Sequence, residues 1–316
     1  MTGAKLDTQR FEVLPRDLSA YRQGNVGVDY VHRFESGKPG PHVLINALTH
    51  GNEFCGMVAV ADLLERGVRP LTGTLTLSFA NVAAYETFDT ARPFDSRLLV
   101  HNFNRIWSSD WLDGASDSPE LRRARAMRPI VDQADHVLDI HSTSQDVEPF
   151  WVYPGFARNA DIALSVGLPS IHLVMPNGLG GAGPPLIQYG RFGTVTGPGD
   201  AQVVECGQHF FQATADCAVS VTRGFLAHFG LATPDPHTRP KQPQRRFELQ
   251  HTHVIQTTDF AFTKPCKGFE VFAKDELIAT DGSVQVRAPC DNCTVLMPAR
   301  EAIVGREGVY LAKPTD

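Results

Sequence analysis

Several features that would assign the chain to other classes are missing from its 316 residues. No apolar run has the length of a membrane-spanning helix, and the first residues lack a secretory signal pattern. There is no Gly-x-Ser-x-Gly elbow, which disfavours a serine hydrolase. The net charge of −6 disfavours a nucleic-acid partner, because such proteins usually carry a basic surface. We therefore expect a cytoplasmic protein with no membrane or nucleic-acid partner.

Cysteine is scarce: the chain has 6, and they are scattered. In a chain of this size without a secretory pattern, such thiols are expected to stay reduced rather than to form a disulfide framework. Cys290 and Cys293 form a CxxC, but no second CxxC exists to complete a zinc ribbon. The surrounding Pro-Cys-Asp-Asn-Cys indicates a turn, so we expect these two cysteines to be structural.

The most informative stretch is residues 43–56, where an apolar run ends in a short polar turn. The apolar run predicts a buried strand, and the apolar spacing after Glu53 predicts a helix. His50 and Glu53 lie in the turn between them. An imidazole nitrogen and a carboxylate oxygen both suit zinc, and α/β sheets place their sites outside the carboxyl ends of strands. Alone, HxxE is a weak signal, because both residues are common where solvated helices begin.

A second histidine stands at the end of another predicted strand. Residues 137–140 are apolar apart from Asp139, and His141 comes where this strand gives way to Ser-Thr. A lone histidine at a strand end is usually only hydrogen-bonded. His141 is nevertheless the third candidate ligand, since catalytic zinc sites often take one ligand from far along the chain. We expect Asp139 to point away from His141 and to be a weaker ligand candidate.

Two later stretches also carry polar residues that could take part in chemistry. The charged segment 85–113 places arginines beside aromatic residues, and loops of this length tend to be functional. A surface loop with solvent-facing arginines is an equally good interpretation. Residues 201–206 predict a strand that carries Glu205, a carboxylate that must be solvated, paired or catalytic. Arg191, which lies between two glycine-rich pieces, is a candidate anion contact.

The composition changes after residue 232. Residues 233–243 are rich in proline and predict a linker. Beyond it, short alternating runs separated by Gly, Pro and Asp turns predict a small all-β module. We therefore expect two domains: an α/β catalytic domain over residues 1–232, and a β domain over residues 244–316 that caps or shapes the substrate pocket.

Together the candidate residues predict a hydrolytic metal site. His50, Glu53 and His141 would form a two-histidine, one-carboxylate zinc site with an open position for water. Zinc would lower the pKa of that water towards neutrality, and Glu205 could pass its proton to a leaving nitrogen. An arginine or the zinc would support the developing oxyanion. Another arginine would hold a substrate carboxylate, because guanidinium and carboxylate match in geometry.

This set of motifs resembles the aspartoacylase and succinylglutamate desuccinylase family, a branch of the zinc carboxypeptidase-like fold. The resemblance implies an α/β fold with a mixed sheet flanked by helices, followed by a small C-terminal all-β domain. It covers about residues 40–230 and is carried by His50-Gly-Asn-Glu53, Arg97, Asn104-Arg105, His141 and Glu205-Cys-Gly.

The resemblance also implies the roles of the site residues. It implies one zinc ion per chain on His50, Glu53 and His141. It implies Glu205 as the general base and then the general acid. Arg97 matches the arginine that the family uses to polarise the scissile carbonyl.

Further residues match positions that bind substrate. Asn104 and Arg105 match two of these, with Arg105 gripping a carboxylate, and Arg191 matches a later arginine that grips an acidic side chain. The chain also departs from the family, because His101 and Asn102 replace its acidic residues before Asn-Arg.

A tyrosine that the family carries at the pocket rim has no clear counterpart, since Ile303 or Arg300 falls near its place. These departures leave the acyl group and the amino acid open. The expected substrate is thus a small anionic N-acyl amino acid or a related amide, and the sequence allows a homo-oligomer. We expect His101 and His209 to shape the pocket by hydrogen bonds rather than to take part in the chemistry.

Two other functions stay open at this point. One is a zinc carboxypeptidase that acts on short peptides, and the other is a non-catalytic metal-binding protein. The β module favours the deacylase, because a cap narrows a groove into a pocket for small substrates. Glu205 argues against a pure binder, because a binder has no need of a base.

Overall fold

The computed structural model describes residues 9–176, 181–234 and 243–315. Its centre is an 11-stranded sheet in the order β1-β3-β2-β4-β7-β5-β6-β8-β14-β13-β10. The first seven strands of the chain are β1 (Val31–Glu35), β2 (His42–Ala47), β3 (Thr74–Phe79), β4 (His136–Thr143), β5 (Phe150–Pro154), β6 (Ile171–Met175) and β7 (Asp200–Gln208).

The central strands read as apolar runs because they are covered on both faces. β2 pairs in parallel with β3 and β4, and β4 pairs in parallel with β7. The strand expected in the apolar run that opens residues 43–56 lies within β2, and those expected at residues 137–140 and 201–206 lie within β4 and β7. β1 begins at Val31, directly after Tyr30, whose φ of 60° is in the left-handed region.

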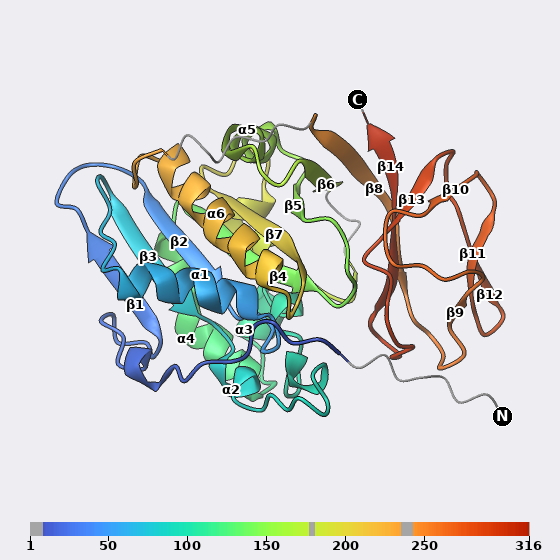
Figure 1. Cartoon of the computed structure of the whole chain (residues 1–316), viewed down its shortest axis with the longest axis horizontal. Coiled ribbons are helices and arrows are strands. Elements are labelled where there is room, and N and C mark those ends of the chain that lie inside the picture. The colour runs from blue at the N-terminus through green and yellow to red at the C-terminus, as the bar shows by residue number, and fades with distance from the viewer. Residues whose placement is uncertain (1–8, 177–180, 235–242, 316) are drawn as a thin grey trace.

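Helices cover both faces of this sheet, as Figure 1 shows. Buried side chains of α1, α5 and α6 pack on one face, and those of α4 pack on the other. The helices are α1 (Phe54–Glu65), α2 (Val82–Tyr85), α3 (Ser109–Leu112), α4 (Pro119–Gln133), α5 (Ala157–Val166) and α6 (Gln212–His228). Short 3-10 turns are η1 (Ser19–Tyr21), η2 (Asp95–Arg97), η3 (Phe103–Arg105), η4 (Leu186–Gln188) and η5 (Gly190–Gly193).

The helix boundaries follow local signals in the sequence. Ser118 caps α4 by accepting a hydrogen bond from the Leu121 amide at 3.1 Å, and Pro119 takes the first helical position. After α1, Gly67 adopts a left-handed φ of 61°, which ends the helix at little steric cost. Within the described ranges, no helix combines the length and the apolar character needed to cross a membrane.

The C-terminal strands extend the same sheet. β8 pairs in parallel with β6 and antiparallel with β14, so the β module joins the catalytic strands edge to edge. Most of the predicted linker, residues 235–242, lies outside the described residues. The strands are β8 (Arg245–Val254), β9 (Ala261–Phe262), β10 (Val271–Phe272), β11 (Leu277–Asp281), β12 (Val284–Arg287), β13 (Cys293–Leu296) and β14 (Glu307–Thr315), with β12-β11-β9 forming a separate sheet. The expected mixed α/β fold with C-terminal β strands is confirmed.

Candidate active site

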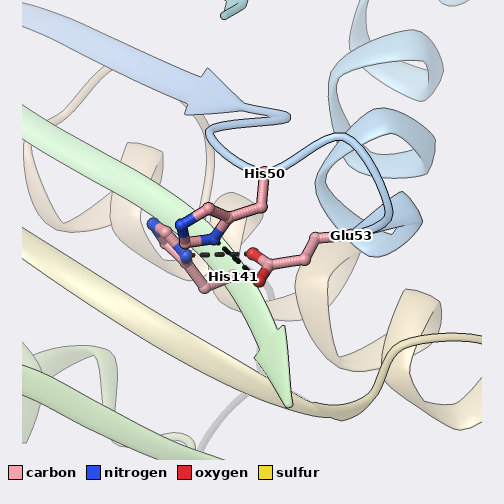
Figure 2. A group of neighbouring side chains, drawn as sticks. All are labelled: His50, Glu53 and His141. Carbon is pink, nitrogen blue, oxygen red and sulfur yellow. Dashed lines mark hydrogen bonds and ion pairs between the residues drawn. The ribbon is translucent and has the colours of Figure 1, made fainter. Parts of the chain in front are cut away.

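Three predicted ligands meet where β2 and β4 end. His50 and Glu53 lie in the turn between β2 and α1, and His141 lies near the end of β4. Figure 2 shows the three side chains pointing toward one another, and their donor atoms all lie within 4.8 Å of one another. All three are buried, with 2%, 1% and 2% exposure in chain order. The structure thus brings together residues that are about 90 positions apart in the chain.

Both imidazoles have a hydrogen-bond acceptor on each side. His50 Nε2 lies 2.9 Å from Asn102 Oδ1, and its Nδ1 lies 2.9 Å from Glu53 Oε1. His141 lies between Glu53 Oε2 at 2.9 Å and Asp139 Oδ2 at 2.8 Å. Burial lowers the pKa of His50 to about 4, so at neutral pH its Nδ1 turns a lone pair toward a carboxylate oxygen. Two lone pairs that face each other repel, and a cation bound between His50 Nδ1 and Glu53 Oε1 would remove this repulsion. The donor set therefore fits a metal ion.

Asp139 has a different role from the one expected. Residues two apart on a strand share a face, so Asp139 points to the same side as His141 and contacts it, and the expectation was wrong. Its other oxygen accepts hydrogen bonds from Asn46 Nδ2 at 2.9 Å and Thr49 Oγ1 at 2.7 Å. The carboxylate therefore fixes the outer nitrogen of His141 and leaves the inner one for a metal.

Asn102 performs the corresponding task for His50 with a neutral amide. Its Oδ1 accepts from His50 Nε2 and also from the backbone N–H of Asn104, each at 2.9 Å. Because the same oxygen takes two donors, the amide orientation is defined by its neighbours. The amide at position 102 thus supplies an acceptor for the outer nitrogen of His50.

Glu205 faces the same space from the neighbouring strand. It is the register partner of His141 across β4 and β7, is 8% exposed and lines the cavity in front of the ligands. Its Oε2 has no hydrogen-bond partner among the described residues. Burial raises the pKa of Glu205 to about 8. A buried carboxylate with a free oxygen is well placed to accept and deliver a proton.

Arg97 comes from the charged loop that sequence analysis left undecided. Its Nη1 donates to Glu53 Oε1 at 2.9 Å, and the side chain lines the cavity. The loop after it is held by Glu120, a buried carboxylate that accepts from the backbone N–H groups of residues 99, 100 and 101. The loop therefore belongs to the site and is fixed from behind by α4.

Asn104 and Arg105 also line the cavity, but both are already engaged. Asn104 Oδ1 accepts from the Leu186 amide at 2.9 Å, which ties two walls of the cavity together. Arg105 Nε donates to Glu307 Oε1 at 2.6 Å, and its Nη2 donates to the Tyr310 hydroxyl at 3.0 Å. Sequence analysis missed both C-terminal partners, because neither stands in a motif.

The structure does not place Arg191 with the other residues. Its guanidinium donates to the Ala134 carbonyl and lies 3.7 Å from Asp135 Oδ1. Both partners precede β4, whereas His141 is near the other end of that strand. Arg191 is not among the residues that line the cavity.

The two remaining histidines differ in position. His209 lines the cavity, and its Nδ1 lies 2.7 Å from Ser142 Oγ, in line with the expected hydrogen-bonding role. His101 packs against Trp111, with ring centroids 5.1 Å apart, and is not part of the cavity wall.

The cavity encloses about 240 Å³ and is lined in part by the C-terminal strands and loops. Arg300, Ile303 and Arg306 belong to this wall, and so does Lys267. Among the described residues, Lys267, Arg300 and Arg306 have no ion-pair partner. Arg300 instead lies over the ring of Phe94 at 4.1 Å. Glu301 and Glu307 lie in the same wall, so the cavity combines carboxylates with three cations that are free to pair with an anionic ligand.

The mixed sheet and the His–Glu–His donor set at its carboxyl edge define an α/β protein with a candidate metal centre. The family model for the succinylglutamate desuccinylase/aspartoacylase catalytic domain matches residues 39–163. That range contains every predicted site residue except Glu205 and Arg191. The resemblance to this family of hydrolases is therefore confirmed.

Solved structures of the same fold agree with this assignment. A succinylglutamate desuccinylase from Vibrio parahaemolyticus has 16% sequence identity and a TM-score of 0.66, over 91% of this chain and 87% of that chain. The product-bound ectoine utilization protein EutE (DoeB) from Ruegeria pomeroyi has 16% identity and a TM-score of 0.64, over 90% and 88%. An aspartoacylase family protein from Mesorhizobium loti has 19% identity and a TM-score of 0.60, over 90% and 89%. No curated protein sequence matches the chain.

Proposed function

We propose that the chain is a zinc-dependent amidohydrolase that removes the acyl group from an N-acyl amino acid or a related small amide. The observation that carries this proposal is the convergence of His50, Glu53 and His141 beside the free oxygen of Glu205. Two nitrogens and one carboxylate suit zinc and leave a coordination position open, as catalytic zinc sites require. One zinc ion bound by these three residues would act as a Lewis acid and lower the pKa of a water molecule.

Glu205 moves the protons of the reaction. Its unpartnered Oε2 takes a proton from the attacking water and then delivers it to the leaving nitrogen. The positive charge of Arg97, and of a metal ion held by the three ligands, favours the ionised form of Glu205, because opposite charges lower the pKa of a carboxyl group. Arg97, whose guanidinium lies 2.9 Å from Glu53, supports the negative charge that develops on the substrate carbonyl oxygen.

The unpaired cations of the cavity bind the substrate carboxylate. Arg105 was the first candidate, but its guanidinium is already paired with Glu307. Arg306 carries a second guanidinium in the cavity wall, and its shape permits a two-pronged contact with a carboxylate. We therefore assign Arg306 to this role together with Arg105, and we no longer assign it to Arg191.

The size of the cavity favours the deacylase over a carboxypeptidase. A volume of about 240 Å³ suits a small substrate, and the C-terminal wall closes one side of it, whereas a carboxypeptidase needs room for a peptide chain. A metal-binding protein without catalysis has no use for a buried carboxylate that lacks a partner. Small N-acyl amino acids are thus the substrates that the site accommodates best.

The test is hydrolysis by the zinc-loaded protein of N-acetyl and N-succinyl amino acids, compared with blocked dipeptides. We expect release of the free amino acid from the acylated substrates. Cleavage of the dipeptides alone would favour the carboxypeptidase. No cleavage of either set, with zinc bound, would favour the non-catalytic protein.

A further inference from the structure

Four buried apolar side chains of one hydrophobic cluster line the cavity. Val203 lies two residues before Glu205 on β7 and therefore on the same face of the strand. Val152 of β5 is its register partner, and Met175 of β6 and Ile187 of η4 pack in the same cluster. All four side chains are buried and line the cavity. We call Val152, Met175, Ile187 and Val203 the apolar wall.

The charged side chains of the cavity come from elsewhere in the fold. They are contributed by the metal-ligand turn, by the loop of residues 97–105, by Glu205, and by C-terminal residues 267–307. Among the described residues that line the cavity, no charged side chain comes from β5, β6 or η4. The apolar wall and the cation-bearing C-terminal wall are therefore formed by different segments of the chain.

This division has an energetic consequence for the substrate. A carboxylate placed against Val203 would lose its hydration and would approach the carboxylate of Glu205, which lies on the same face of β7. A hydrocarbon group in the same place would bury its surface at no such cost. Lys267, Arg300 and Arg306, which have no ion-pair partner among the described residues, offer a substrate carboxylate its cations on the C-terminal side, where Glu301 and Glu307 also lie.

We infer that one of the two groups that flank the scissile amide contacts the apolar wall. This group is an uncharged hydrocarbon, not an acidic group. This inference rests on the proposed function and names its substrate class: small amides with one carboxylate and one apolar substituent. The substituent is either the acyl chain or the amino acid side chain, since both flank the amide. Aspartyl side chains and succinyl groups would be disfavoured wherever they had to contact the apolar wall.

Two series of substrates distinguish the acyl chain from the side chain. The first runs from N-acetylglycine to N-acetylnorleucine, with N-acetylaspartate and N-acetylglutamate as acidic counterparts. The second runs from N-acetylglycine to N-hexanoylglycine, with N-succinylglycine as its counterpart. In the series whose varied group contacts the apolar wall, we expect kcat/KM of the zinc-loaded enzyme to rise about fourfold per added methylene until the wall is covered. The acidic members of that series should have the lowest kcat/KM. A flat profile in both series, or a preference for the acids, would overturn the inference.

A pair of valine variants tests whether the wall itself sets this preference. Val203→Ala removes two methyl groups that face the cavity, whereas Val204→Ala removes the same groups from the opposite face of β7, in the core with α6. The quantity compared is the ratio of kcat/KM for the longest preferred substrate to kcat/KM for N-acetylglycine. We expect Val203→Ala to lower this ratio about 10-fold. Val204→Ala should leave that ratio unchanged. An equal change of the ratio in both variants would contradict the assignment.

A binding measurement separates this inference from the proposed function. The same two series are titrated by calorimetry into zinc-loaded Glu205→Gln, which should bind without turnover. Tighter binding of the longer hydrocarbon members supports the inference even if the wild-type protein hydrolyses none of them, in which case only the proposed function fails. Tighter binding of the acidic members overturns the inference, whatever the wild-type protein hydrolyses.

Discussion

Asp139 offers a quantitative test of how the candidate metal centre is held. Its side chain has no exposure to solvent, and its two oxygens accept three hydrogen bonds from His141, Asn46 and Thr49. In Asp139→Asn the side chain keeps its size, but only one oxygen remains to accept. The amide N–H₂ must then face either His141 Nε2 or the two donors on the other side. Both arrangements weaken the support of His141.

We expect this substitution to lower zinc affinity about 10- to 100-fold, the range found for partners of metal-ligating histidines. That corresponds to roughly 1.4 to 2.8 kcal/mol of binding free energy. The assay is competition for zinc against a chelator, with the dissociation constant compared between wild type and variant at one pH.

The control is Asp200→Asn, which breaks a second buried Asp–His contact in the same sheet. Asp200 pairs with His136 at the amino ends of β4 and β7, at the end of the sheet away from the candidate metal centre. We expect it to lower stability but not zinc affinity. The reasoning would be refuted if Asp139→Asn bound zinc as tightly as wild type, or if both variants lost affinity equally.

Three further predictions concern other parts of the site. Glu205→Gln should lower kcat about 10²- to 10⁴-fold with zinc content unchanged, and normal turnover would contradict its role as base. Arg97→Gln should lower kcat about 10²-fold or more while the thermal unfolding midpoint shifts little; an effect on KM alone would point to ground-state binding. Burial opposes ionisation of Glu307, but the Arg105 guanidinium outweighs it and lowers the pKa from 4.5 to about 2. This ion pair should therefore contribute roughly 3 kcal/mol above pH 4.5 and be lost as the pH falls toward 2, so the unfolding free energy of Glu307→Gln should depend less on pH in that window.

The sequence predicted the catalytic strands well because local patterns define them. Buried parallel strands appear in the sequence as short apolar runs, and the run predicted at residues 137–140 lies within β4. His141 and Glu205 were identified because each is a polar residue that interrupts or ends such a run. The pairing that places them side by side across β4 and β7 is non-local, so the sequence alone could not supply it.

The missed features share a physical reason. Glu307 contacts Arg105, which lies 202 positions earlier in the chain. This contact depends on the parallel pairing of β8 with β6, which no local sequence pattern predicts. Arg191 was chosen by its place between glycine-rich pieces, yet its side chain packs beside the start of β4. Asp139 was misjudged although the strand period of two would have placed it beside His141.

The most direct test of the account is the zinc content of the protein after loading and exhaustive dialysis, measured beside that of His141→Ala. The account predicts about one zinc ion per chain in the wild type, as for a catalytic site with three protein ligands, and little or none in the variant. A wild-type protein that retains no zinc, or a His141→Ala protein that retains as much as the wild type, would contradict it.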